Sequence, residues 1–214
     1  AGFWLERIHN KWVRVEFFAA AIIGLFAYAA LAQVHFYDLH AQFSREAQAY
    51  VPVISYLNNQ PKQVVFTSCE DVYSCYFSDY VAQYTSADAP HSKYSGLFLT
   101  PPGYFKKLVF LHYRLLGVKP ADIHATMEQE KESVLQRLFG EYYYFHAGTK
   151  TAVPADIFEQ LTKEYAAYAH THISQMMQDL RITVLIHDNT KASWKADLSG
   201  LQRESINERF TVYR

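Results

Sequence analysis

Apolar side chains are distributed in two ways along this chain: most recur with a helical or strand period, but one early stretch has no polar face. This stretch, residues 17–37, reads FFAAAIIGLFAYAALAQVHFY and contains no formally charged side chain. At about 1.5 Å of rise per residue, a helix of this length covers roughly 30 Å, the thickness of a bilayer's hydrocarbon core. A helix that is apolar all round is surrounded either by lipid or by a large core. We therefore expect a transmembrane helix.

This segment has two alternative interpretations. A secretory signal peptide has a shorter apolar stretch and a small-residue cleavage site, whereas Gln33, His35 and Asp38 occupy the end of this one. A buried helix of a soluble protein is the other alternative, because frequent alanines keep the segment only moderately hydrophobic. The rest of the chain is too small to surround such a helix completely, which favours the membrane.

Flanking charges predict the orientation of the helix. Three basic residues precede it, namely Arg7, Lys11 and Arg14, and the first basic residue after it is Arg45. Lys and Arg accumulate on the cytoplasmic side of membrane helices. We therefore expect residues 1–40 to form a cytoplasmic flank and transmembrane helix, and residues 41–214 to form an extracytoplasmic domain. The lipid bilayer is then the first expected partner.

The remainder of the chain alternates between strand-like and helix-like patterns. Short β-branched and aromatic runs predict strands at 63–68, 141–146, 181–187 and 210–213, the last pairing with a run from Leu201. Apolar residues at helical spacing predict helices at 43–57 (interrupted at Pro52), 71–84, 105–116, 119–139 and 154–180. Alternating strands and helices indicate an α/β fold. We expect a small, mostly parallel or mixed sheet flanked by helices, behind the N-terminal transmembrane helix.

Composition excludes several classes of function. Half of the 214 residues are apolar, which is enough to fill a core and excludes intrinsic disorder. Twenty basic residues against 21 acidic ones give a net charge of −1, so a general nucleic-acid binder is not expected. The chain lacks the glycine-rich nucleotide motifs and the G-x-S-x-G nucleophile motif. We expect no cofactor.

The order of elements resembles the C-terminal extracytoplasmic domain, with the last transmembrane helix, of bacterial polytopic GT-C glycosyltransferase-like membrane proteins. The resembling features are the 17–37 segment, VISYLNNQ, QVVFTS, RITVLIHD, Trp194 and the closing FTVYR. In that class the catalytic carboxylates lie in the amino-terminal membrane part, so the resemblance transfers no catalytic residue to this chain. It implies a role in acceptor binding, assembly or stability, with a glycan or lipid-linked sugar as the partner.

Cys69 and Cys75 are the only cysteines, and they fall between a predicted strand and a predicted helix. Outside the cytoplasm, two cysteines that lie close together are oxidised. A spacing of six residues across a turn is compatible with the Cα separation of roughly 4.4–6.8 Å that a disulfide needs. We expect a disulfide, and the alternative is a pair of buried thiols. The ten histidines follow no metal-binding motif, so no metal site is expected.

Four residues are candidates for ligand binding. Asp71 and Asp188 follow predicted strands, where α/β folds place their ligands. Two carboxylates there can bind a sugar hydroxyl or act as acid and base, although an Asp after a strand is commonly a turn or cap residue. Tyr76 and Tyr80 can offer rings for sugar stacking, although tyrosines at helical spacing usually belong to a core or a bilayer interface.

Three functional hypotheses follow. The first is a non-catalytic extracytoplasmic domain of a glycosyltransferase-like membrane protein that contacts a glycan acceptor or a partner. The second is a free-standing binding or assembly protein with a single transmembrane helix. The third is a soluble enzyme that uses Asp71 and Asp188 in a cleft and buries its N-terminal helix.

Overall fold

The computed structural model describes residues 11–69, 71–73, 75–91, 102–139, 154–191 and 193–214. Within the first helix, the side chains of residues 11–17 and 35–43 lie outside the described part. The chain divides into two compact units, residues 1–49 and residues 50–214, whereas the sequence places the boundary at residue 40. Each unit is described by itself below.

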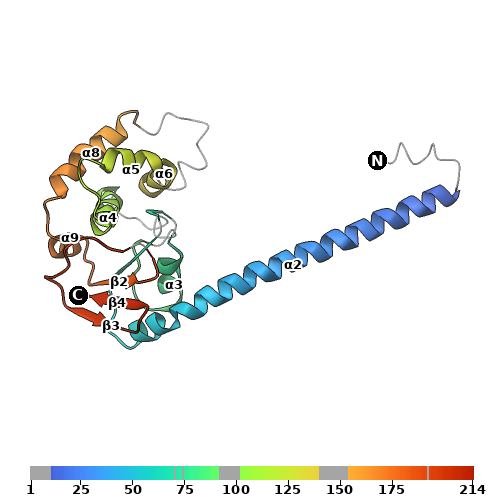
Figure 1. The fold of residues 1–214 in the computed structure, drawn as a ribbon, viewed down its shortest axis with the longest axis horizontal. Coiled ribbons are helices and arrows are strands. Elements are labelled where there is room, and N and C mark those ends of the chain that lie inside the picture. The colour runs from blue at the N-terminus through green and yellow to red at the C-terminus, as the bar shows by residue number, and fades with distance from the viewer. Residues whose placement is uncertain (1–10, 70, 74, 92–101, 140–153, 192) are drawn as a thin grey trace. The chain divides into compact units, whose positions relative to one another are not determined.

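The first unit contains most of one long helix, α2 (Lys11–Asn58), drawn in blue in Figure 1. Every described side chain from 18 to 34 is exposed. The large apolar ones among them are 51% to 74% exposed: Phe18, Ile22, Ile23, Leu25, Phe26, Tyr28, Leu31 and Val34. At 3.6 residues per turn, these positions are distributed all round the helix axis.

No helix among the residues with described side chains has both the length and the apolarity needed to cross a membrane. Phe17 and residues 35–37, the two ends of the expected transmembrane segment, lie outside those residues.

The helix predicted at 43–57 is the last part of α2, and the interruption expected at Pro52 is wrong. The helix continues through Pro52 to Asn58. A proline inside a helix removes one hydrogen bond, and its ring clashes with the carbonyl four residues earlier. Residues on both sides of it, namely Tyr50, Val53 and Leu57, are packed in the second unit's core. This packing keeps the helix continuous.

The second unit is built around a sheet of four short strands, β1 (Val65–Thr67), β2 (Val184–Asp188), β3 (Arg203–Ser205) and β4 (Phe210–Tyr213). Their order is β1-β2-β4-β3, and Figure 1 labels β2, β4 and β3 side by side. The β1–β2 pair is parallel, and β4 runs antiparallel to both β2 and β3. The predicted α/β class with a mixed sheet is therefore confirmed. The strand predicted at 141–146 lies outside the described residues.

Six helices accompany this sheet in the described part of the unit: α3 (Tyr76–Tyr84), α4 (Pro102–Leu115), α5 (Ile123–Gln129), α6 (Lys131–Phe139), α8 (Ile157–Tyr168) and α9 (Ile173–Asp179). Two of the predicted helices are each divided in two. The 119–139 helix is broken at Glu130, and the 154–180 helix is broken before His172, whose backbone is extended.

The sheet separates two cores because successive strand residues point to opposite faces. Val65, Val184 and Ile186 face one core, together with Tyr50, Val53 and Leu57 of α2 and Phe77 and Val81 of α3. Phe66 and Leu185 face the other core, which includes residues of helices α4, α5, α6, α8 and α9. Helices thus cover both faces of the sheet, and the parallel strands β1 and β2 end at one edge between the two layers.

Candidate functional site

The carboxyl ends of β1 and β2 meet at one edge of the sheet. The backbone N–H of Ser68, just after β1, donates to the Ile186 carbonyl at 2.9 Å. The backbone N–H of Asp188, the last residue of β2, donates to the Ser68 hydroxyl at 2.8 Å. The residues after these strands are therefore neighbours, as parallel pairing requires.

The carboxylate of Asp188 is fully buried and bound by its own surroundings. Two nitrogens of Arg209 donate to it: Nε lies 3.0 Å from both oxygens, and Nη2 lies 2.6 Å from Oδ2. Thr190 donates its backbone N–H and its hydroxyl to Oδ1. Burial raises the pKa of Asp188, but the hydrogen bonds from Arg209 and Thr190 and the charge of Arg209 lower it by more. Asp188 is thus an ionised anchor between β2 and β4.

Asp71 lies in a turn and contacts a different set of groups. Its Oδ1 accepts the backbone N–H of Tyr73 at 2.7 Å, a common turn arrangement for Asp. Its charge contributes to raising the pKa of Glu130, for which burial is the largest cause. The hydrogen bonds described for Asp71 and Asp188 share no residue.

Tyr76 and Tyr80 begin a row on α3 that continues at Tyr84, because residues four apart share a helix face. Tyr76 and Tyr84 are 49% and 56% exposed. The ring of Tyr80 stacks on that of Tyr84 with centroids 6.1 Å apart, and it also lies 5.4 Å from the ring of Tyr50. The row therefore consists of one partly buried ring, that of Tyr80, between the two exposed rings of Tyr76 and Tyr84.

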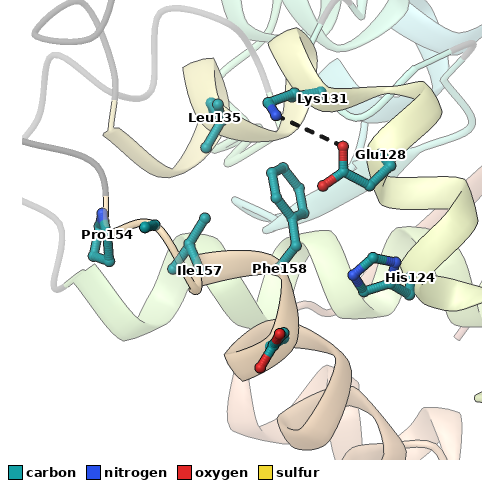
Figure 2. Close-up of a pocket in the computed structure, with 9 residues that line it drawn as sticks. His124, Glu128, Lys131, Leu135, Pro154, Ile157 and Phe158 are labelled. Carbon is teal, nitrogen blue, oxygen red and sulfur yellow. Dashed lines mark ion pairs between the residues drawn. The ribbon is translucent and has the colours of Figure 1, made fainter. Parts of the chain in front are cut away.

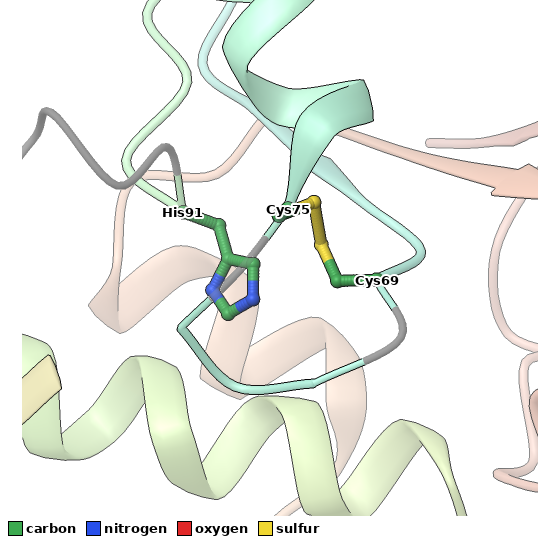
Figure 3. A group of neighbouring side chains, drawn as sticks. All are labelled: Cys69, Cys75 and His91. Atoms are coloured by element: carbon green, nitrogen blue, oxygen red, sulfur yellow. A yellow bond between two sulfur atoms is a disulfide. The ribbon is translucent and has the colours of Figure 1, made fainter. Parts of the chain in front are cut away.

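A disulfide joins Cys69 and Cys75, with their Cα atoms 5.1 Å apart. The imidazole of His91 lies beside this bond (Figure 3), and one of its ring nitrogens and the two sulfurs lie within 4.8 Å of one another. All three side chains are buried. We call Cys69, Cys75 and His91 the disulfide–histidine cluster. The hydroxyl of Thr67, the last residue of β1, is 3.3 Å from the Cys75 sulfur, so the end of β1 contacts the cluster.

The buried surroundings keep His91 neutral. Its ring lies 4.7 Å from Phe66 and is stacked on His112 at 5.6 Å. Burial lowers the pKa of His91 well below its usual value, and the charges of Arg137 and His112 lower it further. Burial and then the charge of Arg137 also lower the pKa of His112, to about 4.

Arg137 itself connects the helical layer to this region. Its Nε donates to the Val72 carbonyl at 3.0 Å, and its Nη2 donates to the carbonyl of His91. Burial lowers the pKa of Arg137 to about 10, so the guanidinium is charged at neutral pH. It carries a positive charge close to two neutral histidines.

A separate cavity of about 340 Å³ lies between α5, α6 and the start of α8. Phe158 forms its apolar wall, and the Lys131 ammonium lies 5.5 Å above the Phe158 ring. Lys131 also lies 3.6 Å from Glu128, and His124 is at the same opening (Figure 2). None of the four predicted ligand-binding residues lines this cavity.

The disulfide–histidine cluster could not be found from the sequence. His91 lies sixteen positions after Cys75, in no motif with it, and it reaches the disulfide only through the fold. Among the other histidines, His170 and His172 are exposed, and His187 contacts Asn189 and the Trp194 ring. His146 lies outside the described residues.

No protein-family model, curated protein or solved structure matches this chain.

Proposed function

We propose that this chain is an extracytoplasmic binding or assembly domain, held at a membrane by the apolar part of α2 and lacking catalytic residues of its own. The observation that carries the proposal is the exposure of every described side chain from 18 to 34.

Water is a poor solvent for this surface. Complete burial of a large apolar side chain stabilises by about 1.5–3 kcal/mol, and eight such side chains here are more than half exposed. Removing these side chains from water would therefore stabilise the protein by on the order of 10 kcal/mol. Because apolar residues lie on all sides, a one-sided groove cannot cover them, whereas lipid can.

The disulfide supports an extracytoplasmic location for the second unit. Structural disulfides persist in oxidising compartments and are rare in the cytosol, and Cys69 and Cys75 are bonded within the buried part of this unit. The concentration of basic residues before the apolar segment predicts the same orientation.

The surroundings of the two carboxylates support a non-catalytic role. Asp188 is bound by Arg209 and Thr190, and Asp71 accepts from the backbone of its own turn. Neither arrangement resembles a pair of carboxylates converging on a substrate. The soluble-enzyme hypothesis therefore gains no support from these residues.

Binding of a glycan acceptor or a partner follows from the resemblance to GT-C glycosyltransferase-like proteins, and the exposed rings of Tyr76 and Tyr84 offer a surface for it. The alternative, a free-standing binding protein with a single transmembrane helix, shares the same anchor. The two differ in whether further apolar spans precede Ala1 in the gene.

Flotation of the full chain with phosphatidylcholine–phosphatidylglycerol vesicles tests the proposal. We expect the chain to float with the vesicles. The double substitution Ile23→Asp with Phe26→Asp should release it, since each charge at a bilayer centre costs about 2.5–3.5 kcal/mol. Val51→Asp, at an exposed position of the same helix in the second unit, is the matched control and should still float. A wild-type chain that stays monomeric at the bottom of the gradient would refute the anchor.

A further inference from the structure

We propose that Cys69, Cys75 and His91 bind one Cu(I) ion when the disulfide between the two cysteines is reduced. This inference concerns the second unit alone and does not rest on the proposed membrane anchor.

The geometry brings three donor atoms to one point. The two sulfurs and a ring nitrogen of His91 lie within 4.8 Å of one another, as Figure 3 shows. The Cα atoms of the cysteines are 5.1 Å apart, so rotation of the side chains can separate the sulfurs after reduction without moving the backbone. The three side chains are 0% to 6% exposed, which places the donors out of contact with bulk water.

His91 is poorly satisfied in the disulfide form. The side chain of His91 is completely buried, and neither ring nitrogen makes a hydrogen bond of ordinary geometry with the described residues. In the described part of the chain, the backbone of Asp71 is the one group near enough to raise the pKa of His91 by hydrogen bonding. A buried polar atom without a partner costs about 1–3 kcal/mol. Histidine binds metal ions through either ring nitrogen, and such a bond would remove part of this cost.

The donor set selects the ion. Two thiolates and one imidazole are soft or borderline ligands, which favour Cu(I) or zinc over magnesium, calcium or manganese. Structural zinc sites in proteins have four protein ligands, and zinc sites with three, such as two cysteines and one histidine, keep the fourth position for water or substrate. Among the described residues this group has three members, all of them buried, and no carboxylate joins it. Cu(I) is the soft ion of the two, and three donors in a dry site suit it better than they suit zinc.

The reaction balances with a dithiol as reductant. The disulfide takes two electrons and two protons from the dithiol, so that the Cys69–Cys75 bond breaks, two thiols form and the reductant becomes a disulfide. Cu(I) then replaces the two thiol protons, which are released to solvent, and keeps its oxidation state. Because both sulfurs are buried, we expect reduction in the folded protein to be slow.

Titration of the full chain with Cu(I) under anaerobic conditions tests the proposal, with bathocuproine disulfonate as the competing chelator. The protein is first reduced with a phosphine, and a thiol assay verifies that two thiols have formed. We expect one Cu(I) per chain in the reduced protein and none in the oxidised protein or in Cys69→Ser with Cys75→Ser. Binding of equal strength in these three samples would overturn the proposal.

The role of His91 is tested by His91→Asn against His112→Asn. Both replace a buried histidine in the same stack, but only His91 belongs to the disulfide–histidine cluster. Losing a ligand should weaken Cu(I) binding by more than the roughly 10–100-fold typical of an outer-shell partner, whereas His112→Asn should have a smaller effect. Equal losses in the two variants would exclude His91 as a ligand.

X-ray absorption of the Cu(I)-loaded wild-type chain answers the same question without a variant that has to fold. Two sulfur scatterers and one nitrogen scatterer are expected. Sulfur scatterers alone would overturn the assignment of His91. Tighter binding of Zn²⁺ than of Cu(I) by the reduced chain would overturn the choice of ion.

Discussion

Two stretches of the same helix, α2, have opposite surroundings. From 18 to 34 every described side chain is exposed, whereas Tyr50, Val53 and Leu57 are 0% to 4% exposed. The buried positions follow a spacing of three and four residues and form a single stripe. The exposed apolar positions lie on all sides. The comparison teaches that apolar side chains on one face indicate packing within the chain, whereas apolar side chains all round indicate an environment supplied from outside it.

The largest expected effect comes from placing a charge in the buried stripe. Val53→Asp should destabilise the second unit by roughly 3–5 kcal/mol, because an unpaired carboxylate would lie in the core. Val51→Asp is the matched control: it makes the same change two residues away at a side chain that is 54% exposed. We expect it to change stability by no more than about 0.5 kcal/mol. Urea denaturation of both variants measures the difference, and similar losses would contradict the buried stripe.

Asp188→Asn should have the next largest effect on the second unit. It removes a charge that Arg209 and Thr190 bind, and hydrogen bonds to charged groups contribute about 1.5–3 kcal/mol. The folded-state pKa of Asp188 is lowered, so its contribution is present above the unfolded pKa of about 3.9 and is lost as the pH falls through the folded pKa. Stability measured from pH 6 to pH 2 should therefore fall less in Asp188→Asn than in the wild type. Parallel curves would exclude this linkage.

Loss of the disulfide should cost about 2 kcal/mol, as expected from the entropy of closing a loop of this length. The loop spans six positions of the chain, and the cost falls on the second unit alone. Cys69→Ser with Cys75→Ser, compared with the oxidised wild type in thermal unfolding, gives the value. Unchanged flotation with vesicles in the same variant would show that the anchor is independent of the disulfide.

The smallest loss of stability is expected for Tyr56→Phe, a change at the surface of α2 beside the buried stripe. The hydroxyl of Tyr56 donates to Glu204 at 2.7 Å and accepts from Arg214 at 2.7 Å, at the surface. Surface interactions of this kind contribute less than about 1 kcal/mol. Tyr56→Phe should therefore lower the urea midpoint only slightly. A loss as large as that of Val53→Asp would mean that this face of α2 is also structural.

The fold follows from the sequence where the local pattern is strong. The run before Asp188 is rich in β-branched and apolar residues and forms the strand β2, whose five residues are all buried. The short run at 210–213 forms β4, and its partner β3 lies just after Leu201. Strands β2 and β4 are rich in β-branched and aromatic residues, which is a local signal.

Features that depend on tertiary contacts could not be predicted. Pro52 favours a helix end, but packing of its neighbours keeps α2 continuous. Nothing in the sequence shows that Arg209 binds Asp188, because 21 positions separate them and the contact depends on the β2–β4 pairing. The meeting of His91 with the disulfide is of the same kind. For Asp71 and Asp188 the turn alternative describes part of their contacts, because each accepts the backbone N–H two residues further along the chain, whereas their role in ligand binding stays a prediction.

The central claim is that the apolar part of α2 is solvated by lipid, and hydrogen exchange tests it most directly. The full chain is bound to phosphatidylcholine–phosphatidylglycerol vesicles, and deuterium uptake is followed by mass spectrometry. The exposed residues 44–46 of the same helix provide the internal reference. We predict that peptides from 18 to 34 exchange far more slowly than those covering 44–46. Equal exchange in the two stretches would contradict the claim.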